Sequence, residues 1–275
     1  MKRKQLRPKK QLGQNFLYDP AIAKRIASAT GLGTGDVAVE LGPGRGILTA
    51  ALAARGARVV AVELDEALCE GLREQFRGND GVEIIQADFT TVKLSSLLAQ
   101  RGLDRCALVG NIPYYLTRDV LFDFLVDEHD VLAGASIMLQ KEVGERIVSP
   151  PGSRVYGITS VVLQSLYDVA TVMKVAPGSF VPRPRVSSVV LSFTPLARPL
   201  LGPGEMEPFK ELVKNLFNQR RKTIQNTLRS FYHLSDEALL EIRENTLVDL
   251  GQRPEQLTKE TFLKLSRTLA EVSSS

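Results

Sequence analysis

One segment constrains the fold of this chain more than any other: a short strand, a glycine-rich turn, a helix and a second strand in direct succession. Residues 37–41 are a mainly β-branched and apolar run, and Gly42-Pro43-Gly44-Arg45-Gly46 follows at once. A helical pattern covers 47–54, and 58–63 is the next apolar strand. Its last residue, Glu63, lies about 20 residues after the glycines, as in the nucleotide-binding half of a Rossmann-type fold.

The spacing of these glycines indicates which nucleotide is bound. The turn has the pattern G-x-G-x-G, and Glu40 stands two residues before Gly42. A pyrophosphate needs backbone N–H groups at a helix N-terminus, whereas a cationic methionine moiety prefers carboxylate and carbonyl neighbours. Gly42 and Gly44 would then simply leave room for it. We therefore expect S-adenosylmethionine as the cofactor and not a dinucleotide, with a plain tight turn as the alternative.

The rest of the first 195 residues continues the alternation of strands and helices. A helix should begin at Asp19-Pro20, an N-cap followed by proline, and stop at Gly31. Further helices are predicted over 65–77, 94–100, 117–127, 141–148 and 157–167, and further strands over 82–86, 106–110, 135–140, 169–175 and 186–193. This order predicts a mainly parallel sheet covered on both faces, ending in an antiparallel edge hairpin.

The strand at 82–86 is followed by Asp88 and Phe89, which suit the base of the cofactor. Asp88 could accept the adenine amino group, and Phe89 could lie against the ring. The alternative is that Asp88 is only an N-cap.

The tetrapeptide after strand 106–110 suits a different base. Side-chain and backbone oxygens at Asn111 and Ile112 could accept the two N–H groups of an exocyclic amine. Pro113 fixes φ and removes a competing donor, and Tyr114 offers a face for stacking. We interpret these residues as catalytic, against the alternative of an ordinary turn after a strand.

A stiff, proline-bracketed loop between the last two strands carries Phe180, Arg183 and Arg185. An aromatic ring held beside two guanidinium groups could clamp a base and its phosphates, so we interpret Phe180 as a further catalytic residue. Equally, Phe180 could lie in the core with the arginines in solvent.

Composition narrows the class of protein. The 275 residues are 44% hydrophobic and 24% charged, as in ordinary globular proteins, and no apolar run reaches the ~20 residues that cross a bilayer. Cys69 and Cys106 lack CxxC spacing, which favours a reducing cytoplasm over a disulfide framework or zinc site. Neither His129 nor His233 has a partner at metal or triad spacing, so no metal is expected.

The chain is expected to contain three parts. Residues 1–11 form a basic, flexible arm, and 12–195 form the cofactor-binding domain. A Pro/Gly-rich linker then leads to a helical domain over 205–275. Its predicted helices are 206–217, 219–231, 235–243, 246–250 and 258–271.

The second of these helices is strongly basic. It contains Arg220, Arg221 and Lys222, and no acid occurs between Glu211 and Asp236. Such a face tracks phosphates, whereas solvated faces usually mix signs. This cluster, the basic arm and Arg183 with Arg185 predict binding to RNA, although a basic arm can also be a solubilising tail.

Four motifs in one order resemble the small-subunit ribosomal RNA adenine N6,N6-dimethyltransferase family: residues 12–17, 40–46, 111–114 and 180–184. The resemblance runs from about Lys9 to the end of the chain. It implies a class I methyltransferase fold with a mostly parallel seven-stranded sheet, and a small all-helical C-terminal domain.

The resemblance also implies the activity. The donor would be S-adenosylmethionine, and the targets two adjacent adenines near the 3′ end of small-subunit RNA in an immature particle. The cofactor contacts carried over by position fall on Asn15, Leu17, Gly42, Glu63, Asp88 and Asn111. A cytoplasmic monomer is expected.

Two other functions are compatible with the motifs. The related enzymes that methylate large-subunit ribosomal RNA share the tetrapeptide, but Gly-Pro-Gly at 42–44 and the Phe180 segment favour the small-subunit branch. A non-catalytic assembly or transcription factor could keep the fold, but intact Asn111, Tyr114 and Glu63 argue against loss of chemistry.

Overall fold

A computed structural model describes residues 15–272, so the basic arm at 1–11 lies outside the described residues. The chain divides into two compact units. The first contains the described residues through Gly144 together with Val169–Pro195. The second contains Glu145–Asp168 and the described residues from Leu196 onward. The assignment of 12–195 to cofactor binding and 205–275 to RNA binding stays a prediction.

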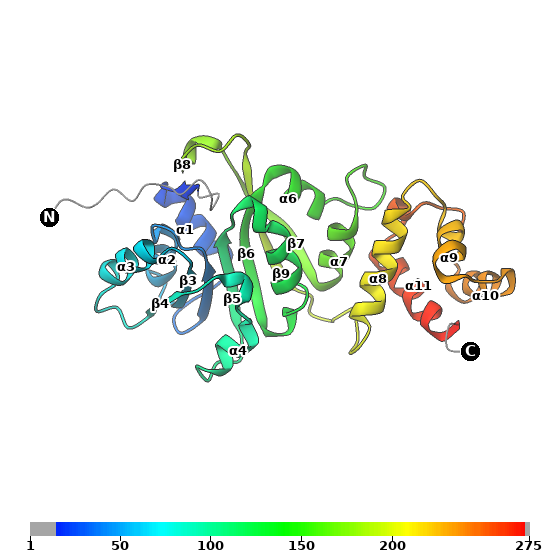
Figure 1. Cartoon of the computed structure of the whole chain (residues 1–275), viewed down its shortest axis with the longest axis horizontal. Coiled ribbons are helices and arrows are strands. Elements are labelled where there is room, and N and C mark those ends of the chain that lie inside the picture. Colours follow the sequence, from blue (N-terminus) through cyan, green and yellow to red (C-terminus); the bar gives the residue numbers. More distant parts are fainter. Residues whose placement is uncertain (1–14, 273–275) are drawn as a thin grey trace. The chain divides into compact units, whose positions relative to one another are not determined.

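The first unit is built on a seven-stranded sheet with the order β4-β3-β2-β5-β6-β9-β7 (Figure 1). Neighbouring strands are parallel from β4 to β6, and β9 runs antiparallel to β6. The strands are β2 (Val37–Leu41), β3 (Arg58–Glu63), β4 (Val82–Gln86), β5 (Cys106–Asn111), β6 (Leu132–Gln140), β7 (Tyr167–Val175) and β9 (Ser188–Pro195). The predicted mostly parallel sheet is confirmed.

Helices alternate with the strands of the sheet, as the pattern predicts, and α1 precedes the first of them. They are α1 (Pro20–Ala29), α2 (Ile47–Ala53), α3 (Glu66–Gln75), α4 (Leu94–Ala99), α5 (Thr117–Asp119) and α6 (Lys141–Ile147). Asp19 caps α1 by accepting a hydrogen bond from the Ala21 N–H at 2.9 Å, and Pro20 is the first helical residue. The helix predicted over 117–127 consists of α5 followed directly by a π-helix over Val120–Phe124, so it ends three residues earlier than predicted.

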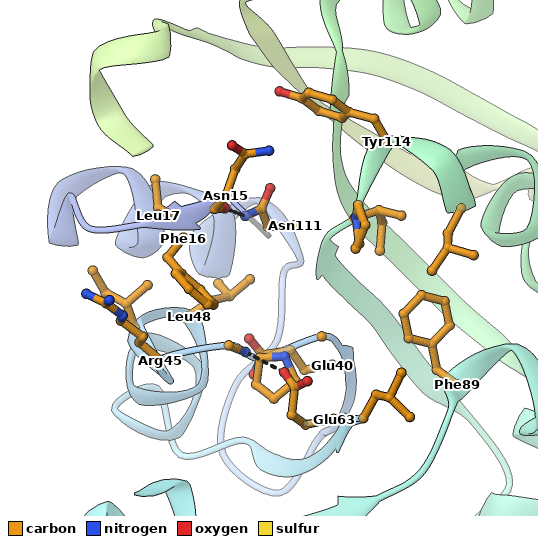
Figure 2. Close-up of a pocket in the computed structure, with 18 of the residues that line it drawn as sticks. Asn15, Phe16, Leu17, Glu40, Arg45, Leu48, Glu63, Phe89, Asn111 and Tyr114 are labelled. Atoms are coloured by element: carbon orange, nitrogen blue, oxygen red, sulfur yellow. Dashed lines mark hydrogen bonds between the residues drawn. The ribbon is translucent and has the colours of Figure 1, made fainter. Parts of the chain in front are cut away.

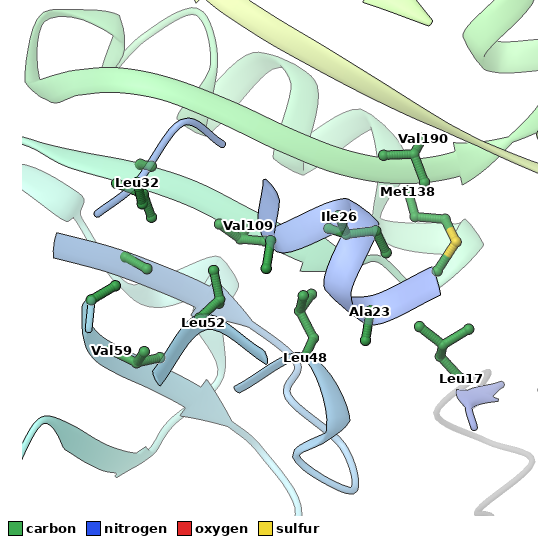
Figure 3. Packing of buried hydrophobic residues seen from close by; sticks show 14 of the residues in the cluster. Leu17, Ala23, Ile26, Leu32, Leu48, Leu52, Val59, Val109, Met138 and Val190 are labelled. Carbon is green, nitrogen blue, oxygen red and sulfur yellow. The ribbon is translucent and has the colours of Figure 1, made fainter. Parts of the chain in front are cut away.

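The core of this unit lies between α1, α2 and one face of the sheet. Figure 3 shows Ile26 of α1 and Leu52 of α2 near Val109 and Met138, and all four are buried in one apolar cluster. Their burial follows from an apolar stripe at helical spacing that packs on β-branched strand residues.

Two short strands outside the main sheet join distant parts of the chain. β1 (Phe16–Leu17) pairs antiparallel with β8 (Phe180–Val181), with Leu17 opposite Phe180. The Tyr18 N–H also donates to the Ser179 carbonyl at 3.2 Å. The segment before α1 is thereby held against the loop between β7 and β9.

The second unit is helical, with α7 (Ile158–Leu166), α8 (Met206–Asn218), α9 (Ile224–Tyr232), α10 (Asp236–Thr246) and α11 (Lys259–Val272). Of the predicted helices in this unit, one begins later than predicted and one is absent. The helix over 219–231 starts only at Ile224, because the Thr223 side chain accepts from the Asn226 N–H and caps α9 there. Residues 246–250 are not a helix, because α10 ends at Thr246 and the residue after it, Leu247, is in the left-handed conformation (φ 57°).

Candidate active site

A pocket opens at the carboxyl ends of the central parallel strands. Leu41 of β2 is in register with Val62 on one side and with Gly110 on the other. The next residues along β3 and β5, Glu63 and Asn111, therefore reach the same edge of the sheet. The pocket is lined by residues 15–17, Glu40, 42–45, 47–48, 63–64, 88–90 and 111–116. The order of the strands reverses here, because the chain passes from β2 outward to β3 and β4 on one side and to β5 and β6 on the other. Open α/β sheets bind ligands at such a point.

The glycine-rich turn requires its glycines for a local reason. Gly44 has φ 58°, and a Cβ at this position would lie 2.9 Å from the ring of Phe16. Its N–H donates to Oε2 of Glu63 at 3.0 Å. The turn is thus closed on one side by Phe16 and tied to β3 on the other, so it forms a fixed floor for a ligand.

Glu63 is held by the backbone. Its Oε2 accepts from the Gly44 N–H (Figure 2), and its Oε1 accepts from the Asp65 N–H at 3.0 Å. Burial raises the pKa of this carboxyl, and the backbone donors act in the opposite direction. A fixed carboxylate with unused lone pairs suits the hydroxyl groups of a ribose.

Among the carboxyl groups that line the pocket, Glu40 has the most strongly shifted pKa. The residue is 1% exposed, and the Thr49 hydroxyl donates to its Oε2 at 2.6 Å. Burial raises the pKa of Glu40 to about 8, and the nearby charge of Glu63 contributes in the same direction. The Glu40 carboxyl is therefore mostly neutral at pH 7, which differs from the charged neighbour that the sequence suggested.

Asp88 and Phe89 form another part of the lining. Oδ1 of Asp88 accepts from the N–H of Thr90 at 3.0 Å and from its hydroxyl at 2.7 Å, so Asp88 is an N-cap, as the alternative reading held. The residue nevertheless lines the pocket. Phe89 is buried and meets the Phe124 ring edge to face, with centroids 6.3 Å apart. An apolar ring beside a carboxylate suits an aminopurine.

The side chain of Asn111 is turned by one hydrogen bond. Its Nδ2 donates to the main-chain oxygen of Asn15 at 2.9 Å, and the two groups face each other in Figure 2. Because the amide oxygen and nitrogen lie on opposite sides of one carbon, this bond points Oδ1 away from Asn15. Asn111 is half-buried and lines the pocket together with Ile112 and Pro113.

The tetrapeptide ends in Tyr114, and a second tyrosine, Tyr115, follows it. Tyr114 is half-buried, and its hydroxyl lies 3.1 Å from the Ser188 hydroxyl, which fixes the ring. Tyr115 also lines the pocket but is 59% exposed. The sequence analysis did not single out Tyr115, although the Tyr-Tyr pair in the sequence is the signal that could have done so.

Phe180 does not lie where the sequence analysis placed it. It is 3% exposed, pairs with Leu17 across β1 and β8, and belongs to the same apolar cluster as Leu17. The exposed clamp expected from Phe180 is therefore not observed, and the alternative of a core phenylalanine describes its position. Arg183 and Arg185 are exposed, and neither lines the pocket.

The basic residues of the second unit lie in a loop and not on a helix face. Arg221 and Lys222 are exposed between α8 and α9. Arg220 is engaged within its own unit: its guanidinium donates to the Arg154 carbonyl at 2.8 Å and lies 3.6 Å from Oε2 of Glu255. Arg221 and Lys222 are thus exposed in the loop, whereas Arg220 is partly exposed and holds contacts within its own unit.

The pocket therefore brings together all of the predicted cofactor residues and the tetrapeptide, while their roles in binding stay predictions. It also contains Arg45 and Leu64, which the sequence analysis did not assign. Within residues 15–272, no group of three or more His, Cys, Asp or Glu side chains is arranged to hold a metal ion. No helix in this range is long and apolar enough to span a membrane.

Sequence comparison connects this geometry to known proteins. The sequence model of the family described as ribosomal RNA adenine dimethylase matches residues 5–271. The chain is 44% identical over 265 residues to the ribosomal RNA small subunit methyltransferase A of Geobacter metallireducens, covering 96% of each. It is 38% identical to the protein of the same name from Moorella thermoacetica, covering 98% of this chain and 95% of that relative.

Solved structures share the fold. A dimethyladenosine transferase from Plasmodium falciparum superposes with a TM-score of 0.78 at 22% identity, covering 91% of this chain and 95% of that one. The 23S rRNA methyltransferase ErmE superposes with a TM-score of 0.72 at 28% identity, covering 93% and 100%. The first unit has the class I methyltransferase fold that the sequence predicted.

Proposed function

The chain belongs to the ribosomal RNA adenine dimethylase family, and from this premise we propose that it dimethylates the N6 atoms of two adjacent adenines near the 3′ end of small-subunit ribosomal RNA. The methyl donor is S-adenosylmethionine. One observation carries the chemistry: the hydrogen bond from Asn111 to the Asn15 main chain leaves the amide oxygen of Asn111 directed away from that partner, within the pocket lining.

The residues present fit this cofactor. Gly42 and Gly44 have no side chains that would fill the bottom of the pocket. The carboxylate of Glu63, which is held by backbone N–H groups, is suited to the ribose. Asp88 has a second carboxylate oxygen for the adenine amino group, and Phe89 packs beside the ring. When bound, the cofactor supplies a methyl group on a positively charged sulfur.

The target adenine is positioned by the tetrapeptide. Oδ1 of Asn111 and the carbonyl of Ile112 accept the two N6–H groups, which draws the nitrogen toward a tetrahedral geometry and aims its lone pair at the methyl carbon. Tyr114, fixed through Ser188, stacks on the base. Positioning of this kind can supply ~7–11 kcal/mol of the barrier, and the acceptors stabilise positive charge developing on nitrogen.

The bonds and charges balance without a strong base. The N6 lone pair would form the new N–C bond while the C–S bond breaks. The electron pair of the C–S bond would stay on sulfur. The nitrogen then carries a positive charge and loses a proton to water. Within the described residues, neither His129 nor His233 lines the pocket, which is consistent with this scheme.

Substrate contacts outside the pocket are assigned by charge. Arg183, Arg185, Arg221 and Lys222 are exposed and are proposed to contact phosphates of the RNA. Extrusion of the adenine from its stack costs a few kcal/mol, which stacking on Tyr114 offsets. The partner is proposed to be an immature small ribosomal subunit, and the protein to act as a monomer in the cytoplasm. The two cysteines are buried free thiols, which suits a reducing compartment.

The direct test is incubation of the protein with labelled S-adenosylmethionine and unmodified small subunits, followed by mapping of the methylated adenines. We expect label on two adjacent adenines near the 3′ end. Label on large-subunit RNA alone would favour the large-subunit branch, to which the similarity with ErmE also points. Cofactor binding without transfer to either RNA would contradict an enzymatic role.

A further inference from the structure

The pocket is lined by more carboxyl groups than basic groups. Three carboxyl groups line it, from Glu40, Glu63 and Asp88. Among the described residues of the lining, Arg45 is the one that carries a positive charge. S-Adenosylmethionine has an amino-acid chain that ends in a carboxylate, and this group needs a donor away from the acids.

The position of Arg45 is set by an aromatic neighbour. Its guanidinium carbon lies 4.9 Å from the centroid of the Phe16 ring, over the ring face. Phe16 is itself fixed by β1–β8 pairing, and its ring occupies the space that a Cβ on Gly44 would need. A guanidinium that stacks through its face carries its N–H donors around its edge, where they match the two oxygens of a carboxylate.

The arrangement of the pocket leaves this end to the amino-acid chain. Figure 2 shows Phe89 and Arg45 on opposite sides of the view, with Glu63 between them. The adenine is assigned to Phe89 and Asp88, and the ribose to Glu63. The remaining part of the cofactor then extends toward the wall that contains Phe16 and Arg45.

We infer that Arg45 binds the α-carboxylate of S-adenosylmethionine and thereby selects cofactors with an intact amino-acid chain. This inference rests on the proposed function, because it takes the proposed cofactor as the ligand. It assigns a role to the position between the second and third glycines of the turn, where the chemistry of the turn itself requires no particular side chain.

The test compares ligands that differ only in this group. Calorimetry would measure the Kd of S-adenosylmethionine and of its decarboxylated analogue for the wild type and for Arg45→Gln. The wild type should bind the decarboxylated analogue about 10-fold or more weakly than the cofactor, as expected for loss of a charge-assisted hydrogen bond. Arg45→Gln should bind both ligands with the same Kd, and Arg45→Lys should recover part of the difference.

Controls separate the outcomes. 5′-Methylthioadenosine lacks the whole amino-acid chain, so its Kd should be the same for the wild type and Arg45→Gln. Arg77→Gln removes an exposed arginine that pairs with Glu74 outside the pocket, and it should change no Kd. If Arg45→Gln weakened all three ligands equally, or weakened none, the inference would be overturned. If the wild type bound none of them, the proposed function itself would fail.

Discussion

Two carboxyl groups on neighbouring strands, Glu40 and Glu63, show how single residues set the properties of the pocket. Glu63 is tied to backbone N–H groups and can serve as an acceptor for a ligand. Glu40 is fully enclosed and bonded to Thr49. One residue is therefore suited to contact the cofactor, whereas the other supports the turn from below as a mostly neutral acid.

Glu40 should make stability depend on pH. Burial raises its pKa from 4.5 to about 8 in the folded protein, so between these values the folded state holds a proton that the unfolded state has lost. Stability then falls as pH rises from about 5 to 8, by about 3 kcal/mol. Glu40→Gln cannot ionise and should lose most of this slope in urea unfolding at several pH values. Equal slopes for both proteins would mean that Glu40 is charged in the folded state.

Asn111 should act on the chemical step more than on cofactor affinity. Removal of a positioned hydrogen-bonding group from an active site costs about 10²- to 10³-fold in kcat. We expect this loss for Asn111→Ala, with the Kd of S-adenosylmethionine changed by less than about 3-fold. Single-turnover methylation and calorimetry would measure the two quantities. Equal losses in both would indicate that Asn111 mainly holds the wall formed by Asn15.

At the level of elements, the pairing of β1 with β8 decides what the loop before β9 can do. The pair joins Leu17 to Phe180 and buries both side chains. It also fixes Phe16 above the glycine-rich turn and the Asn15 carbonyl beside Asn111. Phe180 thus supports the pocket from behind, through the strand that forms one wall.

Phe180 and Tyr114 should therefore respond differently to substitution. Phe180→Ala should cost about 3–5 kcal/mol of stability by leaving a cavity. Phe180→Leu should cost less than about 1.5 kcal/mol and keep kcat within a few-fold. Tyr114→Ala should slow methyl transfer by at least about 10-fold through lost stacking, for which ~1–3 kcal/mol is typical. Urea unfolding and methylation rates would be measured for all three.

The outcome for Phe180→Leu is decisive. A stable Phe180→Leu protein with a large loss of kcat would show that the ring reaches the substrate despite its burial. That result would support the role of Phe180 in clamping a base, which the sequence suggested.

At the level of the whole molecule, some of the proposed phosphate contacts lie in a different unit from the pocket. The pocket is lined entirely by residues of the first unit, and the exposed Arg221 and Lys222 belong to the second. The second unit also includes Glu145–Asp168, a segment that comes before most of the last two strands of the sheet in the sequence. Affinity for RNA and affinity for cofactor should therefore be separable by mutation.

RNA binding should depend on salt in a way that identifies the contacts. Arg221→Gln and Lys222→Gln should each reduce the slope of log K against log salt by about 0.7–0.9, and neither should change the Kd of the cofactor. Lys264→Gln, an exposed lysine on α11, is the matched control in the same unit. Filter binding to unmodified small-subunit RNA at several salt concentrations would give the slopes, and unchanged slopes would place the RNA elsewhere.

Arg220→Gln should affect the stability of the protein, in contrast to the two substitutions above. It should lower the stability of the second unit, because it removes the hydrogen bond to the Arg154 carbonyl and the charge beside Glu255. Urea unfolding would measure this loss directly.

Local patterns in the sequence determined most of the first unit and the position of its pocket. The order of strands, helices and glycines between 37 and 63 predicted the parallel sheet, and Glu63 and Asn111 were each placed at the end of one of its strands, where the pocket lies. Such features depend on neighbours a few residues away, or on the general rule that parallel strands end at one edge.

Only the tertiary structure decided the environment of Phe180, Arg220 and Arg45. Phe180 is buried because it pairs with Leu17, which lies far away in the sequence, and Arg220 is engaged because the loop at Arg154 approaches it. Arg45 gains its place in the pocket from Phe16. These contacts join distant segments, and burial and charge pairing depend on which segments meet, so residue type and local spacing alone do not determine them.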